Sequence, residues 1–473
     1  MISKLANFIK SNVSWHYLIF ILVFIYIQAI FLAAYNPGLM SPDSFDQLKQ
    51  ARGFFFTSWH PLFSTLYVYV FDRLFVSPIG ISMANIGIFL LFILIVVGTF
   101  KENKKLLTVV LAFYCIMPIY YLYNLSLWKD VPYSYFLAMT IVFLYRVIVN
   151  KRIKDLILLL VCVLLVTLFR HNGITVTIAT IVSVLLLPGI SKNIKIIWIT
   201  CLIAFIIIIR AILISTLPEA KTPVIINQSN FYIILMSHIS SLPHNGHQGL
   251  INELEVLSPI IDPELLSASY YPGYITTLLF TPSIALDHTK IVDNKKLIVE
   301  TFIKLFIKYP LLILRSIFIH GSLVWSPFTF KNSGYYVVER GGDVCLVGSS
   351  AYSEYKCDEY RIRDIEYFNF FAPNITEKVD KLIFNEKLNH IFFMRPVMFI
   401  GAIIISILWG IRKKSGLLKY ILILTLPLII QTLTMFFLAQ AQDFRYHYSI
   451  AMVAPVFTLI MYGLSNQGLA KHI

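Results

Sequence analysis

The sequence predicts an all-α membrane protein that crosses the bilayer many times, and three observations support this fold class. Hydrophobic residues make up 58% of the 473 residues and charged residues only 14%, whereas a soluble domain is about 45–50% apolar and about 25% charged. The mean hydropathy is +0.76. Runs of leucine, isoleucine and phenylalanine recur through most of the chain, which is typical of membrane helices and not of the short alternating strands of membrane β-barrels.

Apolar runs that could span the roughly 30 Å of a bilayer core define the expected helices. The ten runs comprise residues 17–35, 79–100, 106–123, 131–149, 156–169, 174–187, 196–213, 391–411, 418–438 and 449–464. The first run is too long for a signal peptide and no small-residue cleavage site follows it, so we expect a signal anchor. The sequence thus predicts about ten transmembrane helices.

Four short connections rich in lysine and arginine set the expected orientation. They are residues 101–105, 150–154, 191–195 and 412–419. The positive-inside rule places such connections in the cytoplasm, and ten spans with the N-terminus inside put all four there. Two further apolar stretches, 60–75 and 309–324, would reverse this parity if they crossed, so we expect them to lie as helices along the outer surface.

This topology divides the chain into three parts. They are an N-terminal transmembrane module (1–213) with a first outer loop (36–78), an extracytoplasmic region with a juxtamembrane helix (214–390), and a C-terminal transmembrane module (391–473). Many prolines in irregular chain predict a small mixed fold for the middle region. Cys345 and Cys357 both lie in it, and we expect a disulfide between them in an oxidising compartment.

The charge pattern excludes one class of partner and suggests a location. The net charge is +14, but the lysines and arginines lie between apolar runs rather than in one patch, so we expect no nucleic-acid partner. An outer disulfide fits a periplasm. The sequence therefore favours a bacterial inner membrane, with the lipid bilayer as the surroundings of the helices.

The first outer loop carries a candidate catalytic carboxylate. Asp43 follows a proline directly after the first apolar run, and we expect it near the membrane surface at the start of a short helix. It could take a proton from an acceptor hydroxyl as general base, or it could merely cap that helix, a role open to Ser41 as well. Asp46 lies three residues further on, and His60 opens the expected surface helix.

Charged groups in the short outer connections are the other candidates, because those connections should be poor in basic residues. A charge at the membrane costs about 2.5–3.5 kcal/mol on insertion scales, so each needs a partner or a function. Lys129 suits a phosphate as a point charge. Asp130 could orient Lys129 or bind a divalent cation, although a local ion pair that caps the next helix is the alternative.

Two arginine clusters complete the set. Arg170 stands before His171, Asn172 and Gly173, and the glycine permits a tight turn. Arg445 is flanked by aromatic residues, so it could bind a phosphate bidentately while Tyr446 lines a sugar or lipid pocket. The alternative for both arginines is snorkelling to the interface. One carboxylate and three cation clusters at similar depth describe a site for an anionic, lipid-linked substrate.

At these residues the sequence resembles the GT-C class of polytopic glycosyltransferases that use polyprenyl-phosphate sugars. Members include serotype-converting O-antigen glucosyltransferases, protein mannosyltransferases and the aminoarabinose transferase that acts on lipid A. The likeness lies in the acidic first outer loop, the segments 59–62 and 129–130, and the late Arg445 and Tyr446. It covers roughly the first 190 residues and the last 80.

The resemblance implies roles for these residues. Asp43 would be the catalytic base, and Lys129, Arg170, Arg445, His60 and Tyr446 would bind the lipid phosphate and its sugar. Asp46, Asp130, His171 and Asn172 would support them. Some members hold a divalent cation at the position of Asp130 and others work without metal; no other cofactor is implied.

The expected reaction is an inverting transfer of glucose or another hexose from undecaprenyl phosphate to a surface glycan such as the O-antigen of lipopolysaccharide, on the periplasmic side. One alternative is an O-antigen polymerase or ligase, whose essential residues would lie chiefly in the large outer region. Another is a lipid or sugar transporter or flippase, which would show broken helices or charges in mid-membrane.

Overall fold

The computed structural model describes most of the chain as helices. The described residues are 15–217, 225–244, 248–271, 286–327, 373–383, 395–413, 415–439 and 443–466. Every regular element within these ranges is a helix. The expected disulfide between Cys345 and Cys357 lies outside the described residues.

Among the described residues, seven helices are long and apolar enough to cross a membrane, which confirms an all-α polytopic membrane protein. They are α2 (Trp15–Ala34), α5 (Ile79–Phe100), α8 (Asp130–Asn150), α11 (Lys192–Thr216), α22 (Pro396–Lys413), α23 (Leu418–Leu438) and α24 (Tyr448–Asn466), the last with the preceding 3-10 turn η5 (Phe444–His447). The other three expected spans also form helices. Two of them, α9 (Ile153–Phe169) and α10 (Gly173–Leu186), are shorter, so the count of ten spans stays a prediction.

The remaining expected span is broken. Helices α6 (Lys104–Ile116) and α7 (Pro118–Leu125) meet at an angle of 59° and make an eighth span only if both belong to one crossing. The break falls at Met117, whose backbone is extended. A residue before proline avoids the helical region and proline itself has no N–H, so Pro118 ends one helix and begins the next.

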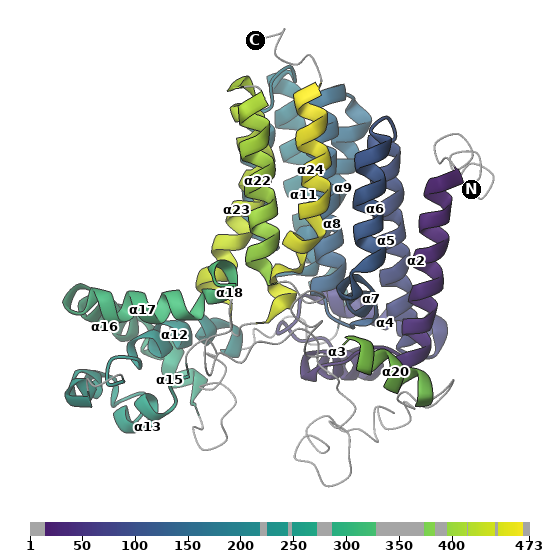
Figure 1. Cartoon of the computed structure of the whole chain (residues 1–473). Coiled ribbons are helices and arrows are strands. Elements are labelled where there is room, and N and C mark those ends of the chain that lie inside the picture. Colours follow the sequence, from purple (N-terminus) through teal and green to yellow (C-terminus); the bar gives the residue numbers. More distant parts are fainter. Residues whose placement is uncertain are drawn as a thin grey trace.

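The helices alternate in direction, which gives the bundle two distinct ends (Figure 1). The connections α5–α6, α8–α9, α10–α11 and α22–α23 share one end, which we call the basic end because they carry the four lysine- and arginine-rich segments. The connections α7–α8, α9–α10 and α23–α24 lie at the opposite end. Lys129, Arg170 and Arg445 are therefore all brought to that opposite end.

Short helices cover the opposite end. Helices α3 (Pro42–Gly53) and α4 (Leu62–Phe75) lie there, and α17 (Pro310–His320) runs across the direction of the bundle (Figure 1). At 14 and 11 residues, α4 and α17 are shorter than the roughly 20 residues of a spanning helix. The two apolar stretches that parity excluded as spans therefore do form short helices, the second continued by α18 (Ser322–Trp325). Their position along the outer membrane surface stays a prediction.

The described part of region 214–390 is helical, whereas a mixed fold was expected. It contains α12 (Ile225–Ile239), η1 (Gln248–Leu257), α13 (Pro263–Ala268), α15 (His288–Asp293), α16 (Lys295–Lys308), α17, α18 and α20 (Pro373–Ile383). Helices α12, α13, α15, α16, α17 and η1 share a small apolar core of their own. Amphipathic helices bury their apolar faces against each other. The apolar residues of this region therefore form a core between helices, where a mixed fold was expected.

Prolines inside two spanning helices are matched by hydroxyl groups on neighbouring helices. Pro427 in α23 cannot donate to the carbonyl of Ile423, and Ser183 of α10 donates its hydroxyl to that oxygen at 2.8 Å. Pro455 in α24 likewise leaves the carbonyl of Ala451, which accepts from Tyr120 at 2.9 Å. In hydrocarbon each unsatisfied carbonyl is costly, so these bonds fix α23 and α24 against the N-terminal module.

Candidate active site

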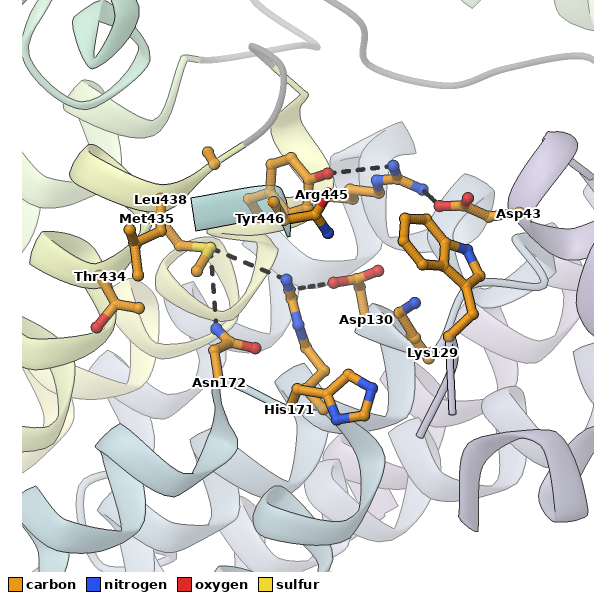
Figure 2. A pocket seen from close by; sticks show the side chains of 14 residues that line it. Asp43, Lys129, Asp130, His171, Asn172, Thr434, Met435, Leu438, Arg445 and Tyr446 are labelled. Atoms are coloured by element: carbon orange, nitrogen blue, oxygen red, sulfur yellow. Dashed lines mark hydrogen bonds and ion pairs between the residues drawn. The ribbon is translucent and has the colours of Figure 1, made fainter. Parts of the chain in front are cut away.

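The sequence-predicted residues converge on one cavity of about 450 Å³ at the end of the bundle opposite the basic end. Figure 2 shows them pointing toward one another from α3, from the start of α8, from the α9–α10 turn and from η5. The lining residues are Asp43, Trp59, Lys129, Asp130, Arg170, His171, Asn172, Asn230, Thr434, Met435, Leu438, Ala439, Arg445 and Tyr446. Of the predicted site residues that the structure describes, only Asp46 and His60 do not line it directly.

A two-bond bridge holds the first loop against the segment that precedes Lys129. The N–H of Leu39 donates to the carbonyl of Leu125 at 2.8 Å, and the N–H of Leu127 donates to the carbonyl of Leu39 at 3.0 Å. The indole of Trp128 donates to the hydroxyl of Ser41 at 2.6 Å. A side chain at Gly38 would collide with this segment, and the residue has a φ of +147°, so glycine is required there. Asp43 and Lys129 are thus positioned by one local assembly.

Asp43 is not the cap of its helix. Ser41 occupies the N-cap position of α3, and its N–H donates to the hydroxyl of Ser44 at 3.2 Å. The Asp43 carboxylate instead accepts from Arg445 at 2.8 Å. Burial alone would raise the pKa of Asp43, but the charges of Arg445 and Lys129 outweigh it and hold that pKa well below its usual range. The group is therefore a carboxylate whose negative charge already has a partner.

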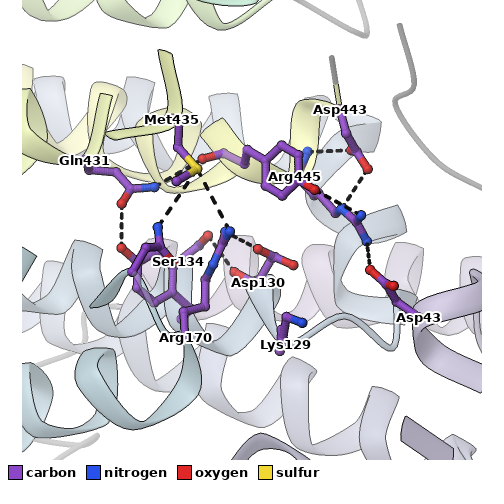
Figure 3. A network of polar contacts seen from close by, with 12 residues as sticks. Asp43, Lys129, Asp130, Ser134, Arg170, Gln431, Met435, Asp443 and Arg445 are labelled. Atoms are coloured by element: carbon purple, nitrogen blue, oxygen red, sulfur yellow. Dashed lines mark hydrogen bonds and ion pairs between the residues drawn. The ribbon is translucent and has the colours of Figure 1, made fainter. Parts of the chain in front are cut away.

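Arg445 is clamped from four sides, which argues against simple snorkelling. Its Nε lies 2.7 Å from a carboxylate oxygen of Asp443, and its terminal nitrogens donate to Asp43 and, at 3.3 Å, to the hydroxyl of Tyr446. The guanidinium lies 5.3 Å from the ring centre of Trp128 and 5.1 Å from that of Tyr446. Figure 3 shows this group at one end of a continuous polar network. A planar guanidinium held in this way is oriented for bidentate contacts.

The expected local partnership of Lys129 with Asp130 is replaced by a pair between helices. Asp130 forms an ion pair with Arg170, and both side chains are more than nine-tenths buried. The guanidinium of Arg170 also lies over the rings of Tyr133 and Tyr446, at 5.4 and 5.3 Å from their centres. Arg170 therefore does not snorkel to the interface. Asp130 neutralises the charge of Arg170 within the site. The main structural role of Arg170 is therefore to position the α9–α10 turn.

Lys129 belongs to a second chain of contacts, which includes Asp46 and His60, the two predicted residues that do not line the cavity. Its Nζ donates to His60 Nδ1 at 2.9 Å, and His60 Nε2 lies 3.0 Å from a carboxylate oxygen of Asp46. Since an ammonium only donates, His60 Nδ1 accepts and Nε2 carries the proton. Burial, and next to it the charge of Lys129, lower the pKa of His60, so the ring is neutral. Asp46 and His60 thus orient the lysine.

His171 and Asn172 lie on the far wall of the cavity. Burial and the charge of Lys129 lower the pKa of His171 to about 4, so this ring is also neutral near pH 7. The amide of Asn172 lies 3.9 Å from the sulfur of Met435. In the described part of the chain no three His, Cys, Asp or Glu side chains form a group suited to a metal ion, and Asp130 is engaged by Arg170. The divalent cation at Asp130 stays a prediction.

Sequence reasoning missed several residues of this site. Asp443 holds Arg445, and the short spacing in Asp-Phe-Arg could have suggested that contact. Met435, Thr434 and Leu438 come from the end of an apolar span and give no signal of their own. Asn230 enters from α12, a helix of region 214–390. Only the packing of that region against the bundle brings Asn230 here.

Comparison of the chain with protein-family models, with curated proteins and with solved structures finds no match. The resemblance to GT-C glycosyltransferases therefore stays a prediction, and the case for a function depends on the geometry of this cavity.

Proposed function

We propose that this protein is a membrane glycosyltransferase that moves a hexose from undecaprenyl phosphate to a cell-surface glycan. One observation carries the proposal. A partly exposed carboxylate, Asp43, shares a cavity at the end of a membrane bundle with three cationic groups, Lys129, Arg170 and Arg445. A base and a phosphate site side by side are what transfer from a sugar phosphate to a hydroxyl requires.

In the proposed reaction the acceptor oxygen attacks the anomeric carbon of the donor sugar. The bond between that carbon and the phosphate oxygen breaks, and its electron pair leaves with undecaprenyl phosphate. The hydroxyl proton passes to Asp43. Phosphate is a good leaving group and needs no proton, so Lys129 and Arg445 would stabilise the charge that develops on it. Removing one such donor should raise the barrier by about 2.7–4 kcal/mol, by analogy with oxyanion sites.

The Asp43–Arg445 ion pair gives this proposal an order of events. In the absence of donor, Arg445 lowers the basicity of Asp43. An arriving phosphate would compete for the same guanidinium, because charge-assisted bonds from arginine to phosphate and to carboxylate are similar in kind. If Arg445 bonds partly to the phosphate, its effect on Asp43 weakens and the pKa of Asp43 rises. The base would thus become effective only when the donor is in place.

The test compares surface polysaccharides from cells that express the wild-type chain, Asp43→Asn or Asp46→Asn at equal membrane levels. Mass spectrometry and NMR should detect an added hexose with the wild type and its loss with Asp43→Asn. Asp46→Asn should retain transfer at a reduced rate, because it acts only through His60. An unchanged glycan in Asp43→Asn cells would contradict a base role. A change in chain length without a new sugar would instead favour a polymerase or ligase.

A purified assay completes the test. General-base catalysis contributes about 100- to 10,000-fold, so Asp43→Asn should lower kcat by that factor with an undecaprenyl-phosphate sugar as donor. Movement of labelled donor across vesicles without any transfer product would instead support the transporter reading.

A further inference from the structure

A second, smaller cavity adjoins the candidate active site. Its volume is about 180 Å³, and it lies between the start of α4, the end of α9 and the last turns of α11. Apolar side chains such as Phe63, Leu168 and Leu213 form much of its wall, but Arg210, His60 and His171 also line it. A cavity of this composition offers a cation inside a largely apolar surround.

Arg210 is an unusual residue for its position. It stands on α11 between two runs of isoleucine, leucine and alanine, six residues before the helix ends at Thr216. Six residues correspond to about 9 Å along a helix, and the apolar run 196–213 ends three residues after Arg210, so the charge stands within the last turn of the expected span. Most of this helix faces outward, and Arg210 is exposed. Among the described residues no carboxylate forms an ion pair with it. Such an intramembrane charge is by default part of a functional site.

Two histidines connect the cavity of Arg210 to the candidate active site. His171 lines both cavities. His60 lines the smaller one, and its Nδ1 accepts from Lys129, which lines the larger one. Arg210 is close enough to His171 to contribute to the lowering of its pKa, after burial and Lys129. A group bound beside Arg210 would therefore lie across a thin wall from the site of transfer.

We propose that the smaller cavity binds the phosphate group of a second membrane lipid, the one that anchors the acceptor glycan. This inference rests on the proposed function. Arginine favours phosphate through paired bonds, and the outward-facing α11 would let a lipid enter from the bilayer. The larger cavity already holds Lys129 and Arg445 for the donor phosphate beside the base. The second phosphate is therefore assigned to the acceptor.

Binding without turnover tests the cavity first. The full chain, in phosphatidylcholine nanodiscs, is titrated with undecaprenyl phosphate or undecaprenyl pyrophosphate and examined by native mass spectrometry. We expect the wild type to take up two copies. Arg210→Gln should weaken the binding of one copy about tenfold, as expected for loss of one charge-assisted contact, and Arg210→Lys should restore part of it. Lys192→Gln, at the other end of α11, is the matched control and should leave both copies bound.

Three results would overturn the proposal. They are uptake of a single copy by the wild type, equal binding by Arg210→Gln and wild type, and equally strong competition by phosphatidylglycerol, which would mean that Arg210 only contacts bulk headgroups. Because these measurements need no transfer, they stand whether or not the chain proves to be a glycosyltransferase.

A transfer assay then separates the two sources of phosphate. The same glycan is offered either linked to a prenyl pyrophosphate or free in solution. If the acceptor anchor occupies the cavity, Arg210→Gln raises KM for the linked acceptor about tenfold and changes neither the KM of the donor nor transfer to the free glycan. A higher KM for the donor would overturn the assignment to the acceptor. Absence of transfer by the wild type would contradict the proposed function alone.

Discussion

Asp43 and Arg445 form an ion pair at 2.8 Å although 402 residues separate them in the chain. Asp43 is the second residue of the short helix α3, and Arg445 lies in the turn η5 before the last spanning helix. Their contact closes the polar network of the candidate active site. It also makes the properties of the carboxylate depend on the state of the arginine.

Arg445→Lys should impair transfer although the positive charge is kept. Lysine cannot make the paired contacts of guanidinium with Asp43 and Asp443 or stack in the same way between Trp128 and Tyr446. We expect kcat/KM for the donor to fall about 100-fold or more. The check is a transfer assay on protein whose thermal unfolding matches that of the wild type. A variant as active as the wild type would mean that a point charge is sufficient at this position.

The pH profile should reveal the Asp43–Arg445 contact. The pKa of Asp43 is held well below its usual range, so protonation of this group should not limit wild-type kcat/KM between pH 5 and 8 (a range far above about 3.9, the ordinary value). Arg445→Gln removes the main charge that lowers this pKa, while burial still raises it. Residual activity of this variant should therefore decrease as the pH falls, over a range in which the wild type is constant.

The control for that profile is Asp43→Asn combined with Arg445→Gln, which should lose the acid limb. The lowered pKa of Asp43 in the wild type also affects the stability of the folded protein. Because the folded-state pKa lies below the unfolded-state value, the contact stabilises the fold above about pH 3.9 and this contribution is lost as the pH falls further. If activity still decreased at low pH in the double variant, that decrease would come from a group other than Asp43.

Breaking the buried Asp130–Arg170 pair should destabilise the protein. Arg170→Met leaves the Asp130 carboxylate buried without its partner, and removal of one member of a buried pair typically costs about 3–5 kcal/mol. Adding Asp130→Asn removes the uncompensated charge and should recover much of that loss. Thermal unfolding in detergent, compared across the two single variants and the double variant, measures the coupling. If the double variant lost as much stability as the two single variants together, the two groups would not depend on each other.

Gly173→Ala should disturb the turn that carries Arg170. A Cβ at this position would lie 2.2 Å from the carbonyl oxygen of Val166, a backbone atom that cannot move aside cheaply. We expect a loss of about 1–3 kcal/mol in stability and weaker donor binding. Gly87→Ala in α5 is the matched control, because a Cβ there would meet nothing within 4 Å. It should be neutral or slightly stabilising.

Sequence patterns predicted the membrane class, the approximate ends of most expected spans and the residues that meet in the cavity, because charge is rare in such a chain and each exception stands out. They did not predict partners. Asp130 stands next to Lys129 in the sequence but pairs with Arg170, an outcome that depends on how helices pack. The sequence left the cap of α3 open between Ser41 and Asp43, and Ser41 occupies it. The contribution of α23 through Met435 could not be predicted, since an apolar side chain in an apolar helix carries no signal.

Pro427 and Pro455 each leave one backbone carbonyl without its helical donor, and the hydroxyl groups that donate to these carbonyls have a consequence for membrane insertion. While the chain is being inserted, α23 and α24 enter the membrane last, each with one carbonyl that lipid cannot satisfy. The groups that receive them, Ser183 and Tyr120, belong to helices synthesised much earlier. The early helices therefore act as a docking template that selects the position of the late ones. Since η5 lies between α23 and α24, the docking of these two helices also brings Arg445 to Asp43.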